Sequence, residues 1–427
     1  MTVLELFAGA GGASEGLAVL GLDHVGVELD PVAASTAVAA GHQRVVGDVA
    51  ALDPRTFVDV TGIWASPPCT SFSAAGGGAG HRVTDILADA ITRTIAGQQV
   101  MGRAHRECAR VLEAHALTDP KLAKLTEAER SEWAARQATV SALVVEVARY
   151  ARELRPEWVV CEQVPGVLPL WRVLARALRG AGYRAWCGVL CAADVGVPQT
   201  RHRAILVASR IPAHRVGPPE PTHAEHPGSG DLFGPPLPGW VSMATALGPD
   251  WPDRAAWTAN AAVRGELPAY RHGSWVLRTG NNSHVTGRAG SKAGDGDVQR
   301  YERPITRPAP TLDTVTGGKW TLIRPATTVQ GDPRIAPPGH RDREGGESQF
   351  GPETIHVTVA EAACLQGFRA DYPWQGTRTA QFRQIGNAVP PPLAAAVVGH
   401  PLDVDWRPLV AVYLARTALA SDREVAS

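Results

Sequence analysis

The chain has 427 residues, 42 basic and 42 acidic side chains, and 44% hydrophobic residues, which is ordinary for a globular protein of about two domains. This composition excludes a disordered chain, and no apolar run reaches the roughly 20 residues that a membrane-spanning helix needs. The N-terminus lacks the basic start of a secretory signal, so we expect a cytoplasmic protein. Six scattered cysteines predict free thiols, and their spacing predicts no metal site.

Short apolar runs and helical stretches alternate through the first half of the chain. Strands are expected at residues 2–7, 24–30, 44–49, 62–66, 157–164 and 183–190. This alternation is typical of a mostly parallel sheet that is covered on both faces. We therefore predict an α/β domain over residues 1–212, with a helical insertion at about 82–135.

A glycine-rich stretch, "LELFAGAGG" (4–12), follows the first strand. The dinucleotide fingerprint needs a third glycine where this chain has Ser14, and no phosphate-binding loop of the G-x-x-x-x-G-K-[ST] type occurs. The stretch therefore predicts a nucleoside ligand without phosphates. Glu28, at the end of the second strand, suits ribose hydroxyls, and Asp48, at the end of the third, suits an adenine amino group. Phe7 can stack on the base. Each acid alone fits a helix cap or a surface charge equally well.

Two prolines precede Cys69 in the stretch "SPPCTSFS" (66–73). They restrict the backbone, and the strand before them puts the cysteine at the edge of the sheet where open α/β folds bind ligands. A nucleophile fits this position. A small buried cysteine at a tight turn fits it as well.

The pattern changes after residue 212. Residues 213–239 are rich in proline and glycine and predict a linker, and 240–354 contain turns and short β-like runs. Residues 355–427 return to the first domain and end in an appendage. Between 271 and 343 there are twelve Arg or Lys against six Asp or Glu, an excess expected of a nucleic-acid-binding face.

Five motifs occur together in the chain. They are "LELFAGAGGASEGL" (4–17), "SPPCTSFS" (66–73), "CEQVPGV" (161–167), "VPQTRHRAILVA" (197–208) and "RQIGNAVPPPLA" (383–394). In this order and spacing they resemble the DNA (cytosine-5) methyltransferases, over about 1–212 and 355–400. The resemblance implies a Rossmann-like, S-adenosylmethionine-dependent methyltransferase sheet with helices on both faces. It also implies a smaller, irregular, β-rich target-recognition domain at 240–354, and it makes 1–212 the catalytic and cofactor-binding domain.

The resemblance also implies roles for individual residues. Cys69 would add to carbon 6 of a flipped-out cytosine, and Glu162 would act at its N3. Arg201 and Arg203, two apart on one strand, would bind the cytosine carbonyl oxygen and a flanking phosphate. The cofactor-binding residues that we expect are Phe7, Ala8, Gly9, Gly11, Gly12, Glu28, Leu29, Asp48, Val49, Pro67 and Asn387. The expected DNA-binding residues are Gln163, Arg303, Arg307, Thr311, Leu312 and Arg324.

Two departures from the family pattern lie close to the chemistry. The family usually has Asn where this chain has Gln163, and Gln where it has Thr70. An RNA (tRNA) cytosine-5 methyltransferase and a catalytically silent DNA-binding relative therefore stay open as alternatives. The residue that removes the carbon-5 proton is not identified, and water can do so. We expect a monomer that acts on double-stranded DNA, with a cognate restriction endonuclease as a further partner.

Overall fold

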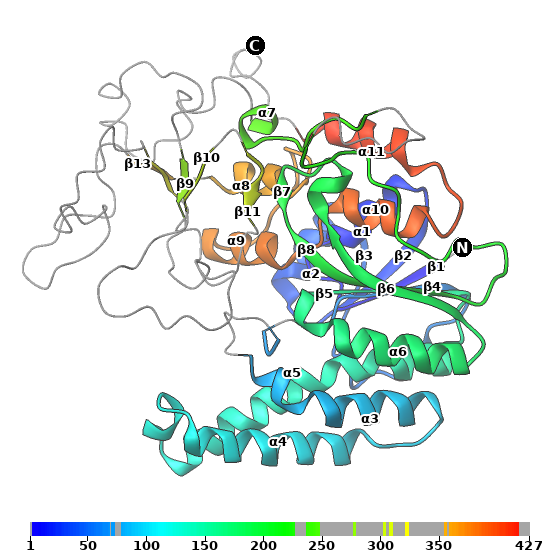
Figure 1. Ribbon diagram of the computed structural model, residues 1–427, viewed down its shortest axis with the longest axis vertical. Helices are drawn as coiled ribbons and strands as arrows, with labels where there is room; N and C mark the ends of the chain where they lie inside the picture. The colour runs from blue at the N-terminus through cyan, green and yellow to red at the C-terminus, as the bar shows by residue number, and fades with distance from the viewer. Residues whose placement is uncertain are drawn as a thin grey trace, which may run out of the picture.

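The computed structural model describes residues 2–68, 70–72, 78–226, 236–247, 276–278, 302–304, 307–310, 321–323, 354–356 and 358–417. A seven-stranded sheet with the order β3-β2-β1-β4-β5-β8-β6 forms its centre (Figure 1). The strands are β1 (Thr2–Leu6), β2 (Asp23–Glu28), β3 (Gln43–Val46), β4 (Val60–Ala65), β5 (Trp158–Gln163), β6 (Arg184–Cys191) and β8 (His202–Ser209).

The strand directions bring the expected site residues to one edge of the sheet. Neighbouring strands from β3 to β5 pair in parallel, whereas β8 runs antiparallel to both β5 and β6. The prediction of a mostly parallel sheet is therefore confirmed. Because β8 is reversed, its beginning lies beside the end of β5, where Gln163 pairs with Ala204. The carboxyl ends of β1, β2, β4 and β5 thus share an edge with the start of β8.

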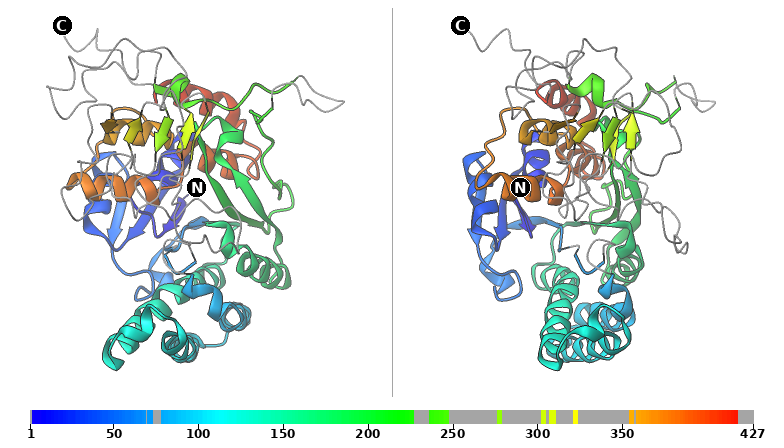
Figure 2. Two further views of the ribbon diagram at one scale, coloured as in Figure 1. Left: turned by 60° about the vertical axis from the view of Figure 1, so that its left-hand side comes forward. Right: turned by 90° about the vertical axis from the view of Figure 1, so that its left-hand side faces the viewer.

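Helices cover both faces of this sheet (Figures 1 and 2). On one face lie α1 (Gly12–Val19), α10 (Pro391–Gly399) and α11 (Trp406–Ala415), and α2 (Pro31–Ala39) packs beside β3. On the other face lie α3 (Thr84–Ile95), α4 (Met101–Thr118), α5 (Glu127–Leu154) and α6 (Leu168–Gly180). Residues 82–135 are thus largely helical, and α4 packs along α5 as an antiparallel pair. None of the helices in the described ranges has the length and apolarity to cross a membrane.

The C-terminal residues 406–415 differ from the appendage that the sequence predicts. They form α11, in which Trp406, Val410 and Tyr413 are at most 4% exposed. These positions are four and three residues apart, so they share one face of the helix. This face packs on α10 and α1, and α11 is therefore part of the core on that side of the large sheet.

A second, smaller sheet is antiparallel, with the order β10-β9-β12-β13. Its strands are β9 (Val276–Arg278), β10 (Glu302–Pro304), β12 (Thr321–Ile323) and β13 (Thr354–His356). Their positions fit the β-rich character predicted for 240–354. A further short strand, β11 (Ala309–Pro310), leaves this region and pairs in parallel with β7 (Gln199–Thr200), directly before Arg201.

A separate hydrophobic cluster surrounds α8 (Val359–Leu365), between α7 (Met243–Leu247) and α9 (Arg378–Asn387). We call it the α8 cluster; its buried members are Met243, Leu247, Ala309, Ala362, Ala363, Cys364, Leu365, Phe368, Tyr372, Phe382, Ile385 and Ala388. Leu247 and Ala309, on either side of the segment 248–306, therefore pack in the same cluster. Residues 243–247 and 309, which the sequence analysis assigns to the target-recognition domain, pack against residues of the C-terminal return.

Candidate active site

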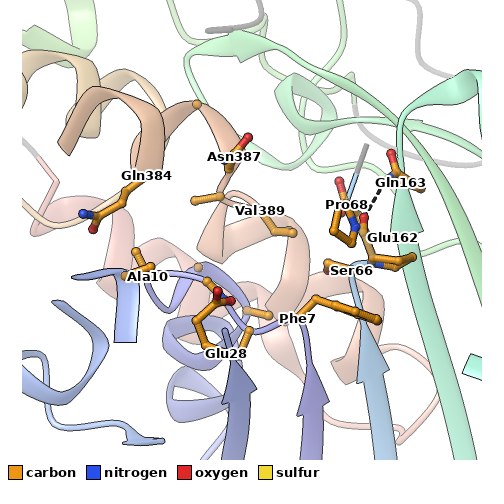
Figure 3. Close-up of a pocket in the computed structure, with 18 of the residues that line it drawn as sticks. Phe7, Ala10, Glu28, Ser66, Pro68, Glu162, Gln163, Gln384, Asn387 and Val389 are labelled. Carbon is orange, nitrogen blue, oxygen red and sulfur yellow. Dashed lines mark hydrogen bonds between the residues drawn. The ribbon is translucent and has the colours of Figure 1, made fainter. Parts of the chain in front are cut away.

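A pocket opens at the carboxyl edge of the large sheet, with residues from six parts of the chain in its wall (Figure 3). The lining residues are Phe7–Ala10, Gly12, Ala13, Glu28, Asp30, Ala33, Trp64, Ser66–Pro68, Thr70, Glu162–Val164, Arg201, Arg203, Arg383, Gln384 and Gly386–Val389. Ala10 and Glu28 lie toward one side of Figure 3 and Pro68, Glu162 and Gln163 toward the other, with Phe7 between them. We call the part around Ala10 and Glu28 the cofactor end and the part around Glu162 the catalytic end, after the roles that the sequence analysis expects of their residues.

The turn between β1 and α1 forms the cofactor end. Phe7, Gly9 and Gly11 all have positive φ angles, of 60°, 56° and 105°, so the turn uses left-handed backbone that glycine adopts without strain. Gly12 meets a different requirement, because a Cβ there would lie 2.1 Å from the carbonyl oxygen of Val389. The turn thus packs directly on the segment after α9.

Glu28 braces this turn. Its Oε2 accepts a hydrogen bond from the Gly9 N–H at 2.7 Å, and its Oε1 accepts one from the Asp30 N–H at 2.8 Å. The two backbone donors hold the carboxylate in one orientation at the pocket wall. Ser14, which breaks the dinucleotide fingerprint, is fully buried and donates its hydroxyl to Glu5 on β1.

An ion pair forms part of the catalytic end. The Nε atom of Arg203 lies 2.8 Å from Oε1 of Glu162, and both side chains are less than 10% exposed. A buried carboxyl group needs a hydrogen-bonding partner, so Arg203 fixes the direction of Glu162.

Arg201 lies close by but not on the strand that the sequence analysis assigns to it. It falls between β7, which ends at Thr200, and β8, which begins at His202. The pairing of β7 with β11 ends at Thr200, directly before Arg201. Arg201 is 1% exposed, and its Nη2 donates to the carbonyl oxygen of Gly386 at 3.0 Å. Both arginines nevertheless line the same pocket.

Gln163 anchors the turn after β4. Its Nε2 donates to the carbonyl oxygen of Pro67 at 2.5 Å, the bond drawn in Figure 3, and its Oε1 accepts from the Val164 N–H. The side chain is 2% exposed, so its amide is held inside the pocket wall. Trp64 supports the same turn by donating its indole N–H to Ser66 Oγ at 2.7 Å. Cys69 itself lies outside the described residues, two positions beyond Pro67.

A family model described as C-5 cytosine-specific DNA methylase matches residues 1–96, 132–229 and 300–400. The chain belongs to this family. It is therefore a DNA (cytosine-5) methyltransferase, and its cofactor is S-adenosylmethionine. The family model leaves 97–131 unmatched, within the helical segment between β4 and β5.

Curated relatives extend over most of this methyltransferase. It is 27% identical to the type II methyltransferase M1.HphI of Haemophilus parahaemolyticus, over 93% of the chain and 85% of the relative. It is also 27% identical to the type II methyltransferase M.XorII of Xanthomonas oryzae pv. oryzae, over 93% of the chain and 83% of the relative.

Solved structures of similar proteins support the fold. The Dnmt2 methyltransferase of S. pombe aligns with a TM-score of 0.51 at 14% identity, over 94% of this chain and 98% of its own. A Spodoptera frugiperda DNMT2 variant aligns with a TM-score of 0.52 at 14% identity, over 94% and 99% of the two chains. The methyltransferase thus has a Rossmann-like fold.

The structure brings together most of the residues expected to bind the cofactor. Phe7, Ala8, Gly9, Gly12, Glu28, Pro67 and Asn387 all line the pocket. The other four expected residues are Gly11, Leu29, Asp48 and Val49, and none of them is among the lining residues. Leu29 is 66% exposed, and Gly11 forms the N-cap of α1. Because β3 ends at Val46, Asp48 is not its last residue; it is exposed, and its Oδ1 accepts from the Ala50 N–H.

The residues expected to contact DNA are described only in part. Thr311, Leu312 and Arg324 lie outside the described residues, and Arg303 is described only as backbone of β10. Arg307 is exposed, and its Nη2 lies 2.7 Å from Oε1 of Glu225. Its guanidinium therefore pairs with a carboxylate of the preceding linker.

Sequence reasoning missed several residues of the pocket. Arg383, Gln384 and Val389 belong to the motif at 383–394, from which the sequence analysis names only Asn387 as a binding residue. The motif itself therefore indicates that these residues are near the site. No local pattern identifies Trp64 and Ser66 as pocket residues. Within the described part of the chain, no three His, Cys, Asp or Glu side chains gather in a way that would hold a metal ion.

Proposed function

We propose that the methyltransferase acts on a cytosine flipped out of a specific duplex DNA sequence, through a covalent adduct between Cys69 and carbon 6. The observation that carries this proposal concerns the neighbours of Cys69. Pro67, Pro68 and Thr70 line the same pocket as Glu162 and the two arginines. The anchor from Gln163 to Pro67 restricts the turn that leads into Cys69.

The cofactor end has the groups that S-adenosylmethionine requires. No side chain fills the space beside Gly9, because a Cβ there would meet nothing within 4 Å. The fixed carboxylate of Glu28 suits the ribose hydroxyls, and the ring of Phe7 suits the adenine. When bound, S-adenosylmethionine supplies an electrophilic methyl group. We propose that these residues hold it and direct it toward the catalytic end.

At the catalytic end, the side chains would make carbon 5 of cytosine nucleophilic. The Cys69 thiolate adds to carbon 6, and the displaced π electrons move toward N3, where Glu162 supplies a proton or hydrogen bond. Carbon 5 is then enamine-like and can take the methyl group. When a base removes the proton from carbon 5, the C–S bond breaks and Cys69 is released as the thiolate. Any proton that N3 took from Glu162 returns to that side chain. Arg203 keeps Glu162 directed at the base throughout.

The described cysteines offer no alternative nucleophile. Burial raises the pKa of Cys108 and of Cys191 to about 11, and it raises that of the fully buried Cys161 further. Such thiols are protonated at neutral pH. Neither these three nor Cys187 and Cys364 line the pocket.

We also propose that the segment 240–354 reads the target sequence. Its charge excess supports this role. The parallel pairing of β11 with β7 supports it as well, because Pro310, the residue before Thr311, lies beside Thr200, the residue before Arg201. The test replaces 248–306 and 311–353 with those of a relative of known target. Bisulfite sequencing should show the relative's target methylated; continued methylation of the original sequence would place recognition elsewhere.

The decisive experiment for the adduct uses duplex DNA that contains 5-fluorocytosine. Fluorine cannot leave as a proton, so the adduct should survive on a denaturing gel with the wild-type enzyme and be absent with Cys69→Ser. Labelled methyl transfer to unmodified duplex DNA and to tRNA is measured in parallel. Transfer to tRNA alone, or no adduct from an enzyme that methylates normal DNA, would overturn the proposal.

The relatives named as type II methyltransferases favour a place in a restriction and modification pair. We therefore propose that a cognate endonuclease shares the target of this methyltransferase, and that the enzyme works as a monomer in the cytoplasm. Plasmid DNA methylated in cells that express the enzyme should resist that endonuclease. Light scattering of the purified protein should give the mass of one chain.

A further inference from the structure

A tyrosine from the C-terminal return contacts the cofactor turn without lining the pocket. The hydroxyl of Tyr372 donates a hydrogen bond to the carbonyl oxygen of Ala10 at 2.5 Å, across 362 positions of sequence. Ala10 lines the pocket between Gly9 and Gly11. The Tyr372 residue is 5% exposed, so water does not compete for this bond.

The position of the Tyr372 ring is fixed by aromatic packing. Its centroid lies 4.7 Å from that of Phe368 and 4.8 Å from that of Trp374. Such contacts hold a ring in place independently of its hydroxyl. Removal of the hydroxyl alone should therefore leave the α8 cluster packed.

Charged side chains near Tyr372 connect the same two parts of the chain. The guanidinium of Arg369 lies 5.3 Å from the Tyr372 ring, and its Nε lies 3.5 Å from Oε2 of Glu15 on α1. The other oxygen of Glu15 lies 3.1 Å from Nε2 of His42. These contacts connect the C-terminal return to the first turn of α1, directly after the cofactor turn.

Gly11 shows how closely the two parts fit. A Cβ at Gly11 would lie 2.5 Å from the Tyr372 hydroxyl oxygen. Only a glycine at position 11 leaves room for the Tyr372 hydroxyl. This explains why the motif has a glycine at a position that does not line the pocket. Three residues of the turn have positive φ, a backbone conformation that persists only when the surrounding structure holds it. The turn therefore depends on contacts such as this one to keep its backbone N–H groups in place.

We propose that Tyr372 is a positioning residue for S-adenosylmethionine: its hydroxyl holds the carbonyl of Ala10 and so fixes the turn that receives the cofactor. It acts through the turn and does not line the pocket. Its loss should thus weaken cofactor binding and leave the chemistry at Glu162 and Arg203 unchanged.

The test is Tyr372→Phe, with Tyr183→Phe as the matched control. Tyr183 is also buried, and its hydroxyl also donates to a backbone carbonyl, that of Pro156, at 2.7 Å, but neither residue lines the pocket. Calorimetric titration with S-adenosylmethionine and with S-adenosylhomocysteine should give a Kd about tenfold higher for Tyr372→Phe with both probes. The KM for cofactor should rise alike, while kcat and the KM for DNA stay within twofold.

The control separates positioning from general stability. Tyr183→Phe should lower Tm by an amount similar to Tyr372→Phe and leave both Kd values unchanged. A second variant, Arg369→Gln, keeps the hydroxyl but removes the charge opposite Glu15, and it should raise both Kd values by a smaller factor. Unchanged cofactor affinity in Tyr372→Phe, or an equal loss in Tyr183→Phe, would overturn the proposal.

Discussion

The two ends of the pocket are built in different ways. At the cofactor end, one continuous turn presents backbone groups, and its shape depends on glycines and on the bonds that Glu28 accepts. At the catalytic end, single side chains from separate elements meet, as with Glu162 from β5 and Arg203 from β8. The first end depends on local chain shape, and the second depends on how distant strands are placed.

This difference should appear in the response to mutation. A change at the catalytic end removes a chemical group and should lower turnover while the fold and cofactor affinity persist. A change at the cofactor end alters the path of the chain and should lower stability and cofactor affinity together. Five substitutions test this division, from the largest expected effect to the smallest.

Cys69→Ser should lower turnover by about 10³-fold or more, because an alcohol is a far weaker nucleophile than a thiolate. Cofactor affinity should stay within twofold, since the proposed role of Cys69 is to act on the base. Single-turnover methylation and calorimetric titration measure the two quantities. Substantial remaining turnover would remove Cys69 from the mechanism.

Glu162→Gln should lower turnover by about 10²-fold or more, because the amide keeps the size of the side chain but cannot give up a proton to N3. The substitution also removes the negative partner of Arg203. Cofactor affinity, measured by titration, should be little changed. A turnover equal to that of the wild type would show that Glu162 does not act as the acid.

Gly12→Ala should lower the free energy of unfolding by about 2–3 kcal/mol, because the new Cβ would overlap the Val389 carbonyl. Gly180→Ala, in α6, is the matched control, since a Cβ there meets nothing within 4 Å. Urea denaturation should show a loss only for Gly12→Ala, together with weaker cofactor binding. Equal stability of the two variants would contradict the close packing inferred at Gly12.

Gln163→Leu should lower turnover by about tenfold, which corresponds to the loss of one buried hydrogen bond, here the bond to Pro67. Cofactor affinity should remain the same. Gln163→Asn keeps the amide on a shorter side chain and should fall between the wild type and the leucine variant. If Gln163→Leu weakened cofactor binding instead, the separation of the two ends would fail.

The pH dependence of stability should show the smallest effect. Burial alone would raise the pKa of Glu15, but its hydrogen bond to His42 and the charge of Arg369 hold that pKa below the ordinary value of 4.5. The ionised group therefore contributes stability above that value and loses it as the pH falls further. Between pH 6 and pH 3, the wild type should lose more stability in urea than Glu15→Gln; equal losses would show that Glu15 contributes nothing.

The sequence predicted the parts of the site that depend on local pattern. The glycine turn and Glu28 at the end of β2 follow from strand periodicity, and Glu162 near the end of β5 follows from the family resemblance. The strand β11, which pairs with β7 directly before Arg201, lies more than 100 residues further along the chain. No local pattern contains that information.

Two further features escaped prediction for a similar reason. The polar sequence around 403 concealed the apolar face of α11, whose three buried positions become clear only when they are read at helical spacing. Tyr372 touches the cofactor turn across most of the chain's length, and a single buried aromatic residue usually indicates nothing more than core packing.

The α8 cluster has a consequence for how this enzyme diverges. Leu247 and Ala309 are buried in the same cluster, so the chain leaves and returns at one place. The entropy of closing a loop grows only with the logarithm of its length, by roughly 0.6 kcal/mol for each doubling. Insertions and deletions between these two residues, outside β9 and β10, should therefore cost the α8 cluster little stability. Related chains can therefore differ in the length of this stretch, outside the two strands, without moving the ends that the cluster holds.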